Sequence, residues 1–216
     1  SERKIYLNDE IEAISAHDVI YEILRFNVED KDIGVADRKP IFLYCTSVGG
    51  SVIDGFGIID AISNSKTPVY TINLAYQYSM GFLIGLAGHK RYAMPNATFL
   101  LHDGQNFVWN SSAKCKDQLK FQEKREQRIK EYVLEHSNLT EKEYDENYRV
   151  EFYTYADEAK KYGNEDIVLI FMSTSKISFP GSGVAVMAAS DANIAHTKSK
   201  MAIQTIGYDK LNMMRH

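Results

Sequence analysis

The stretch "AYQYSMGFLIGLAGHKRYAM", residues 75–94, decides the fold. It follows a strand predicted at residues 69–73, and it contains an apolar helix that we expect to begin at Met80. This helix has almost no polar residues, so we expect it to be buried. Ser79 precedes it, in a place where a hydroxyl is either a helix N-cap or a nucleophile presented at the end of a sheet.

Strands and helices alternate on both sides of this stretch. Short apolar runs predict strands at residues 4–7, 41–45, 90–94 and 98–102, and helical spacing predicts helices over residues 11–26 and 54–64. The run "IFLYC" has no polar alternation, as expected for a strand that is buried on both faces. This order of elements predicts an α/β core with a mostly parallel sheet.

Three further helices and a strand are predicted between residues 111 and 171. Residues 111–135 predict a long helix with dense mixed charge and one thin apolar stripe. Such a helix is either a solvated surface element or one that projects to meet another subunit. The remaining expected elements are a helix at 139–147 with Thr140 and Glu143 as a capping box, a helix at 155–163 that ends at Gly163, and a strand at 166–171.

Composition and charge argue against several classes of protein. The 216 residues carry a formal charge of −4, with a pI near 5.9, and show no basic patch typical of nucleic-acid binding. No apolar run approaches the roughly 20 residues that span a bilayer, and the polar N-terminus does not resemble a signal peptide, so we expect a cytoplasmic protein. We expect Cys45 and Cys115 to be reduced thiols, and zinc-type spacing is missing, so we expect no metal site. We also expect no cofactor.

A pair of glycines follows the strand predicted at residues 41–45. In "SVGGS", residues 47–51, adjacent glycines allow a sharp turn that leaves N–H groups open to an oxyanion or a phosphate. The same pair also fits an ordinary tight turn between a strand and a helix. The segment matches neither a P-loop nor GxGxxG, so neither motif predicts a phosphate site here.

A nucleophilic Ser79 needs a histidine as its base and an acid that orients this histidine. His102 is the best candidate because it ends a predicted strand, although a structural histidine fits the same place. The other histidines lie in helical patterns, in a polar turn or in the C-terminal tail, and they are His17, His89, His136, His196 and His216. The residues leave four choices of acid open, namely Asp103, Asp145, Glu151 and Asp157.

Three segments together resemble the ClpP family of ATP-dependent serine proteases. Residues 41–62 resemble the family's strand, "NSPGG" loop and helix, residues 78–104 its serine and histidine block, and "EFYTYADEAKKYG", residues 151–163, the segment of its catalytic aspartate. The similarity runs in order from about residue 3 to residue 167. By this resemblance Ser79 is the nucleophile, His102 is the general base, and the N–H groups of Gly50 and Met80 form the oxyanion hole.

The resemblance assigns the third catalytic position to Glu151, where the family has aspartate. A glutamate can accept a hydrogen bond from the histidine, but its extra methylene requires a shift of the backbone or of the ring. Asp145 is the alternative acid. Val48 replaces the family's proline, and Tyr78 replaces a small residue, which we expect to narrow the substrate pocket.

The resemblance also implies an architecture and partners. It implies a crotonase-like spiral of ββα units, with a protease domain at residues 1–170, a protruding helical handle at about 105–140, and an atypical extension at 171–216. Stacked rings, heptameric and forming up to a tetradecamer, would enclose a chamber in which unfolded proteins or peptides are cleaved. ATP would be used only by a partner AAA+ unfoldase, with no nucleic-acid or membrane partner.

Three alternatives stay open. A stand-alone relative, such as the phage prohead or TepA-like proteases, needs no ATPase, and the few residues before Lys4 favour it because the family's axial N-terminal loop is expected to be absent or trimmed. The second alternative is a non-catalytic ring subunit, in which the replacement of the family's aspartate by Glu151 has abolished peptidase activity. A crotonase-type enzyme holds an acyl-CoA enolate with paired backbone amides, and it has no need of Ser79 and His102.

Overall fold

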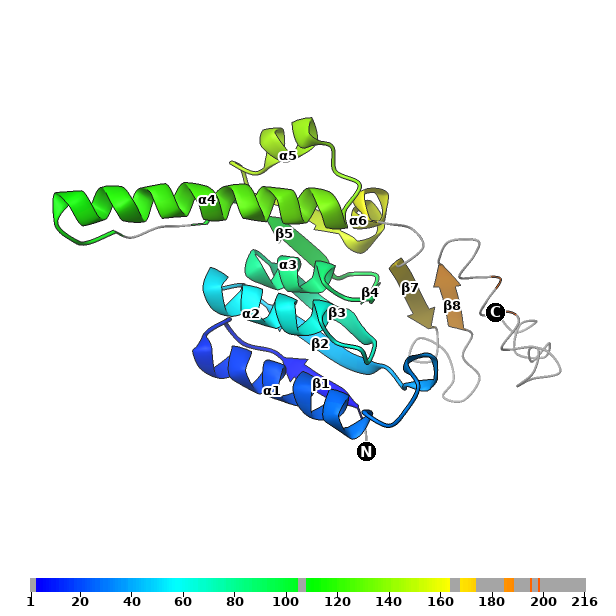
Figure 1. Ribbon diagram of the computed structural model, residues 1–216. Helices are drawn as coiled ribbons and strands as arrows, with labels where there is room; N and C mark the ends of the chain where they lie inside the picture. Colours follow the sequence, from blue (N-terminus) through cyan, green and yellow to red (C-terminus); the bar gives the residue numbers. More distant parts are fainter. Residues whose placement is uncertain are drawn as a thin grey trace.

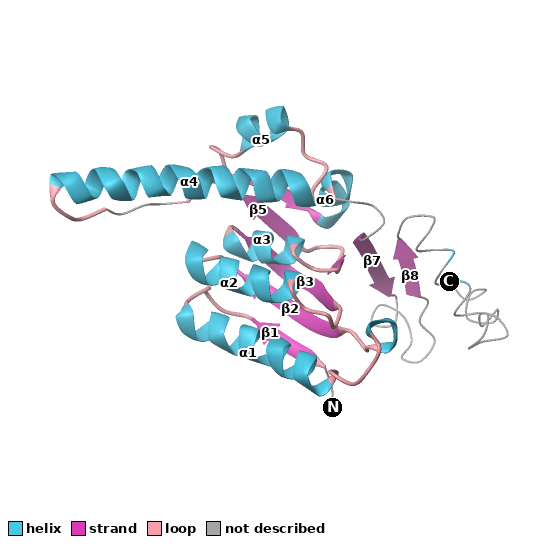
Figure 2. Ribbon diagram, in the orientation of Figure 1, coloured by secondary structure: helices cyan, strands magenta, loops and turns pink. Residues whose placement is uncertain are grey.

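The computed structural model describes residues 3–104, 108–163, 168–173 and 185–188, together with Ala195 and Lys198. It has the predicted α/β architecture, with helices packed on a largely parallel sheet (Figures 1 and 2). Most of the predicted extension at residues 171–216 lies outside the described residues, as do His196 and His216.

The sheet is built around β3 (Val69–Tyr78). The strands β1 (Lys4–Leu7), β2 (Ile41–Ser47), β3, β4 (Lys90–Ala93), β7 (Val168–Ser173) and β8 (Ala185–Ala188) follow one another across it. Neighbours in this row pair in parallel, except β7 and β8, which are antiparallel. Parallel pairing brings the carboxyl ends of strands to one edge, which is where α/β proteins commonly bind their ligands.

β3 is longer than the sequence predicted, and its second half positions the candidate site. Residues 70–73 pair with β4, whereas residues 76–78 pair in parallel with β5 (Thr98–Leu101). β6 (Phe152–Tyr155), which periodicity did not predict, pairs antiparallel with β5. The prediction that this strand ends at residue 73 is wrong, because residues 76–78 pair with β5 and continue the strand. Polar Gln77 is buried there, and its Nε2 donates to Cys45 O at 3.4 Å.

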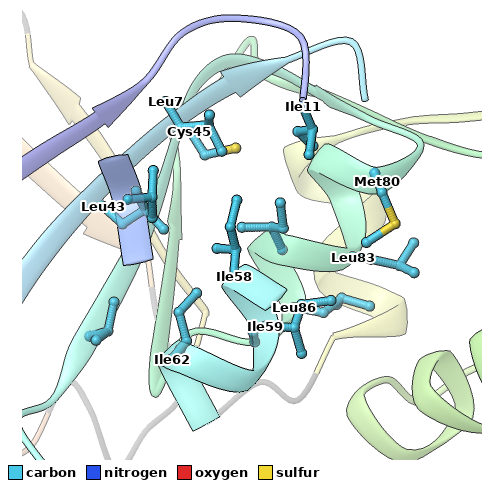
Figure 3. Close-up of a cluster of buried hydrophobic side chains, with 14 of the residues drawn as sticks. Leu7, Ile11, Leu43, Cys45, Ile58, Ile59, Ile62, Met80, Leu83 and Leu86 are labelled. Atoms are coloured by element: carbon cyan, nitrogen blue, oxygen red, sulfur yellow. The ribbon is translucent and has the colours of Figure 1, made fainter. Parts of the chain in front are cut away.

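Three helices cover one face of the sheet (Figure 1), namely α1 (Ala13–Glu29), α2 (Val52–Ser63) and α3 (Met80–Leu86). They form a continuous apolar core with β1 and β2, and its labelled members in Figure 3 are Leu7, Ile11, Leu43, Cys45, Ile58, Ile59, Ile62, Met80, Leu83 and Leu86. α3 begins at Met80, as predicted, and is buried on nearly every side. The core therefore fixes the position of α3 and of the turn before it.

α4 (Ser112–His136) is the predicted long helix, and it projects past the edge of the sheet (Figure 1). Val133, near its C-terminal end, is its one buried residue. In the same region Tyr132 Oη donates to Leu83 O at 3.0 Å, and Ile129 packs against the core. The core thus holds the last turns of α4, and the preceding turns extend outward as a handle.

Two short helices follow α4. α5 (Glu141–Asn147) begins with the predicted capping box, in which Thr140 Oγ1 accepts from the Glu143 N–H at 3.2 Å and the Glu143 carboxylate accepts from the Thr140 N–H at 2.9 Å. α6 (Ala156–Tyr162) ends at Gly163, as predicted. A 3-10 turn, η1 (Val35–Asp37), precedes β2. None of the helices within the described ranges has both the length and the apolar character needed to cross a membrane.

Candidate active site

Ser79 lies in a strained turn between β3 and α3. Its φ is +53° and its ψ is −123°, and no other described residue apart from glycine has a positive φ. This backbone conformation costs on the order of 1–3 kcal/mol and persists only where the surrounding structure imposes it. The Ser79 side chain makes no hydrogen bond to the helix, so the interpretation of this hydroxyl as a helix cap is wrong.

Hydrogen bonds hold the main chain on both sides of Ser79. Its N–H donates to Leu100 O of β5 at 2.9 Å, and its carbonyl oxygen accepts from the Phe82 N–H at 3.0 Å. Met80 is the first residue of α3, and the first N–H groups of a helix have no acceptor within the helix. The Met80 N–H therefore lies next to the serine and has no acceptor within α3.

The glycine loop packs directly against this turn. A Cβ atom placed on Gly49 would lie 2.7 Å from Ser79 Cβ and 3.1 Å from Met80 N, and Gly49 has a φ of +102°. Any side chain here would collide with the serine and strain the backbone, so glycine is required. Gly49 therefore brings the loop and the serine together.

Gly50 faces the segment that precedes α1. A Cβ atom on Gly50 would lie 2.3 Å from Ile11 O, and the Ile11 N–H donates to Gly49 O at 2.8 Å. Ser47 Oγ also holds the loop, because it accepts from the Gly49 N–H at 3.1 Å and donates to Asp9 O at 2.7 Å. Sequence reasoning missed Ser47, although a serine two residues before a glycine is typical of a side-chain-stabilised turn.

His102 lies at the carboxyl end of the strand next to β3. In the parallel pairing, Tyr78 lies opposite Leu100, so Ser79 comes opposite Leu101 and His102 follows one residue later. The imidazole is partly exposed. Neither this ring nor Ser79 Oγ forms a hydrogen bond with another residue in the described part of the chain.

Glu151 lies across from His102 at the start of β6. The antiparallel register sets Leu101 opposite Phe152, and its extension by one residue sets Glu151 opposite His102. The Glu151 side chain is exposed, and it neighbours the phenol of Tyr153. Desolvation and the Glu151 carboxylate together raise the pKa of Tyr153. Tyr153 is thus a neighbour of the candidate acid that no sequence pattern indicated.

The other acids considered from the sequence have different surroundings. Asp145 accepts from Lys130 Nζ of α4 at 2.8 and 3.0 Å, and the carboxylates around this ammonium, Asp145 first, raise the pKa of Lys130. Asp103 is exposed, and its N–H donates to Tyr148 O at 2.8 Å. Asp157 is exposed in the first turn of α6. Asp145, the alternative acid, is therefore already paired with a cation.

Tyr78 belongs to an aromatic cluster beside Ser79. Its ring centroid lies 5.2 Å from that of Tyr76 and 5.7 Å from that of Tyr153, and its hydroxyl bonds to Thr98 Oγ1 at 2.9 Å. These contacts hold the bulky ring in one place, between β3 and β6.

Two other features of the chain are its thiols and its possible metal ligands. Cys45 and Cys115 are free thiols, as predicted, and burial raises the pKa of Cys45 to about 12, so this thiol stays protonated at neutral pH. Within the described ranges, no three histidine, cysteine, aspartate or glutamate side chains are grouped closely enough to hold a metal ion.

The fold and the position of the serine define the class, an α/β protein of the ClpP type with a projecting helical handle. The profile of the Clp protease family matches residues 1–170. The ATP-dependent Clp protease proteolytic subunit 1 of Streptomyces avermitilis is 30% identical over 172 residues, which cover 78% of this chain and 76% of the relative. The chain therefore belongs to the Clp protease family, whose members are hydrolases that act in proteolysis.

A second profile, that of aspartate amino-transferase, matches residues 136–216. This match covers less than half of the chain and overlaps the Clp protease match at residues 136–170. Of the two profiles, only the second reaches residues 171–216, most of which lie outside the described residues.

Proposed function

We propose that the chain is a serine endopeptidase subunit in which Ser79 is the nucleophile, His102 the general base and Glu151 the acid that orients the histidine. The backbone of Ser79 carries this proposal, because it is strained while the hydroxyl is unused by the helix that it precedes. The position of His102 at the end of the adjoining strand gives this hydroxyl a base. A serine that only caps a helix needs neither feature.

In the proposed reaction Ser79 Oγ attacks the carbonyl carbon of a peptide bond while His102 takes the hydroxyl proton. The imidazolium then gives this proton to the leaving amine, and an acyl-enzyme remains. Water, deprotonated by the same histidine, attacks the acyl group, releases the carboxylic acid product and restores Ser79.

The N–H groups of Gly50 and Met80 are proposed to hold the oxyanion. Met80 N–H has no acceptor within α3, and Gly50 follows the glycine that touches Ser79, with a φ of +145° that turns its peptide. Each donor of this kind contributes on the order of 3 kcal/mol to the stability of the transition state in serine proteases.

Two different apolar surfaces support assembly of the subunit with copies of itself. On α1, Ile14, Tyr21, Leu24 and Val28 are exposed at helical spacing. On the sheet face away from the helices, Tyr6 stacks on Tyr44, and Tyr70 contacts both Phe42 and Tyr92. Apolar surfaces of this kind mark interaction sites, and contact between two unlike surfaces is head-to-tail, which gives a ring when the rotation between neighbouring copies closes. A heptamer is the ring size that the family resemblance implies.

The handle supports the stacking of two rings. Leu119 and Phe121 are exposed on the part of α4 that projects beyond the core. Pairing of such handles between two rings would give a tetradecamer and would enclose the serine in a chamber. Unfolded proteins and peptides are the substrates that such a chamber admits.

The proposed partner is an AAA+ unfoldase, which alone would use ATP. The name of the Streptomyces relative describes an ATP-dependent protease, in agreement with such a partner. The proposed subunit itself uses no cofactor and no metal in peptide hydrolysis, and we propose that it acts in the cytoplasm. Peptide cleavage that needs no ATPase, with no response to an added unfoldase, would instead assign it to the stand-alone relatives.

A fluorophosphonate probe tests the nucleophile. We expect covalent labelling at Ser79, no labelling of Ser79→Ala, and labelling of His102→Ala slowed by roughly a hundredfold or more. Ser111→Ala is the matched control, because Ser111 also precedes a helix without a side-chain cap bond but has a φ of −61°. An assembled ring that takes no label would contradict the proposal and would indicate a non-catalytic ring subunit.

Peptidase assays of two matched variants test the acid. We expect Glu151→Gln to lower kcat by up to about 10⁴-fold, the scale known for loss of the orienting acid in a triad. Asp145→Asn should leave kcat unchanged, because Asp145 is already paired with Lys130. The reverse pattern would assign the orienting role to Asp145.

A further inference from the structure

Tyr153 of β6 shares a face of the sheet with the proposed base and acid. It lies opposite Leu100 of β5, and two residues further along the pair His102 comes opposite Glu151 when the register is extended. Residues that are two apart in an extended chain point to the same side. The side chains of Tyr153, His102 and Glu151 therefore stand on one face, in neighbouring positions.

The ring of Tyr153 is held by Tyr78, the residue that precedes Ser79. The two ring centroids lie 5.7 Å apart and the ring planes meet at 84°, which is a favourable edge-to-face contact. Tyr78 is itself fixed, because its hydroxyl bonds to Thr98 Oγ1 at 2.9 Å. The Tyr153 phenol therefore has a defined place, although 52% of the residue is exposed.

The Tyr153 hydroxyl lies beside the carboxylate of Glu151. Desolvation raises the pKa of Tyr153, and the Glu151 carboxylate raises it further, as a negative charge and as a hydrogen-bond acceptor. An ordinary tyrosine has a pKa of about 10, so this phenol is protonated at neutral pH and can donate. A carboxylate has two oxygens with about four acceptor positions, and it can accept from two donors at once.

We propose that Tyr153 is a positioning residue for the orienting acid. Its hydroxyl donates to one carboxylate oxygen of Glu151, and the other oxygen accepts from His102 Nδ1–H. Glutamate has one more rotatable bond than aspartate, so an exposed glutamate loses more conformational freedom when it is held in one geometry. A second donor on the same face supplies this restraint. The inference rests on the proposed function, because it takes Glu151 as the acid of the triad.

Tyr153→Phe tests the proposal, because it removes the hydroxyl and keeps the ring on Tyr78. We expect kcat for a peptide to fall by roughly tenfold with KM unchanged, since a shift of about 1 Å in a catalytic group can cost up to about a hundredfold. Labelling of Ser79 by a small fluorophosphonate should slow by the same factor. Tyr76→Phe is the matched control and should keep both rates. The Tyr76 ring also contacts Tyr78, at 5.2 Å, but it lies two residues further from the serine.

A double-mutant cycle separates positioning from other roles of the hydroxyl. Glu151→Ala leaves no carboxylate to position, so the addition of Tyr153→Phe should slow labelling further by less than about twofold. A purely structural role of the hydroxyl would slow labelling equally with and without Glu151. A role in binding the substrate would raise KM and leave labelling by the small probe unchanged.

Three results would overturn this inference and leave the proposed function in place. They are unchanged kcat and labelling in Tyr153→Phe, equal slowing in the Glu151→Ala background, and an effect confined to KM. Labelling of Glu151→Ala at the rate of the unaltered chain would remove Glu151 from the triad, and the inference with it. If the unaltered chain takes no label at Ser79, the proposed function itself fails and the inference fails with it.

Discussion

The helices α3 and α4 show how differently two parts of one subunit are stabilised. α3 has seven residues, of which six are buried. α4 has 25 residues, of which Val133 alone is buried. Each fully buried Leu or Ile contributes about 1.5–3 kcal/mol, so the core of the chain itself holds α3. The outer turns of α4 have no comparable support within the described residues.

This difference matters for the proposed site. The strain at Ser79, on the order of 1–3 kcal/mol, persists because α3 and the glycine loop are both fixed by their neighbours. The handle is held only by its last turns, as expected of a surface that is completed by another copy. The turn that contains Ser79 is therefore held by the core of the chain itself, whereas the projecting part of the handle is not.

The largest expected effect is on the free energy of unfolding, which a truncated side chain in α3 should lower far more than one on the handle. Ile84→Ala should lower the free energy of unfolding by about 4 kcal/mol, because Ile84 is 0% exposed and the change leaves a cavity in the core. Leu119→Ala on the handle should lower it by less than about 0.5 kcal/mol, because Leu119 is 51% exposed. Urea unfolding of unassembled chains, followed by circular dichroism, measures both. Equal losses would contradict the comparison.

A buried and an exposed ion pair extend the comparison to charge. Asp30 is 1% exposed and accepts from Arg3 Nη1 at 2.7 Å and from Thr67 Oγ1 at 2.8 Å. These bonds, that of Arg3 first, hold the pKa of Asp30 below its usual value. We expect Asp30→Asn to cost about 3 kcal/mol, because it leaves a charge without its partner. Asp145→Asn, in the exposed pair with Lys130, should cost less.

The buried pair of Asp30 and Arg3 also predicts how stability changes with pH. A lowered pKa in the folded state means that the folded chain binds this proton less readily than the unfolded chain. The stabilisation is therefore complete above the usual pKa of aspartate, and it is lost as the pH falls through the folded pKa. Unfolding measured from neutral to acidic pH should show this loss, and Asp30→Asn should show less of it. If Asp30→Asn loses as much stability at acidic pH as the unaltered chain does, the assignment of this loss to Asp30 is contradicted.

A smaller effect is expected in the glycine loop. Gly49→Ala should destabilise the fold by about 2 kcal/mol, since it places a Cβ at a φ of +102° and 2.7 Å from Ser79 Cβ. It should also slow fluorophosphonate labelling, because the serine turn must shift. Gly104→Ala is the control, because a Cβ at Gly104 meets nothing within 4 Å. If both variants label at the same rate, the loop does not position the serine.

The smallest effect concerns two helix starts near the handle. Thr140→Ala should cost about 1 kcal/mol, because the Thr140 hydroxyl accepts from the Glu143 N–H at 3.2 Å. Ser111→Ala should cost less, because the Ser111 side chain makes no cap bond to α4. Thermal unfolding of the two variants, side by side, measures the difference. A larger loss for Ser111→Ala would show that the start of α4 is more strongly capped than its hydrogen bonds indicate.

Much of the fold could be predicted from local patterns. The start of α3 at Met80 follows from an apolar run after a polar residue, and the Thr140 box follows from residue types at fixed spacing. β6 and the second half of β3 could not be predicted this way. Their residues alternate weakly in polarity, and they become strands because each has β5 as a neighbour. Long-range pairing therefore outweighed local preference.

The candidate site divides in the same manner. Residue types and family resemblance pointed to Ser79, His102 and Glu151, but no pattern indicated the contact of Gly49 with the serine or of Tyr153 with the acid. The Gly49 contact joins two turns that are distant in the sequence, and the pairing of β2 with β3 brings them together. Glu151 and Tyr153 are close in the sequence, and they lie on one side of the chain because this segment is extended along β5.

The sequence by itself determined the α/β class, the buried character of α3 and the length of α4, because hydrophobic period is a local property. Its resemblance to a known family, and not local chemistry, singled out the candidate catalytic residues. Only the tertiary structure decided that Ser79 is strained while its hydroxyl caps no helix, that Asp145 is paired with Lys130, and that Arg91 Nε is buried with no hydrogen-bond partner among the described residues. The physical reason is that strain, pairing and desolvation depend on what surrounds a group, and folding supplies those surroundings from distant parts of the chain.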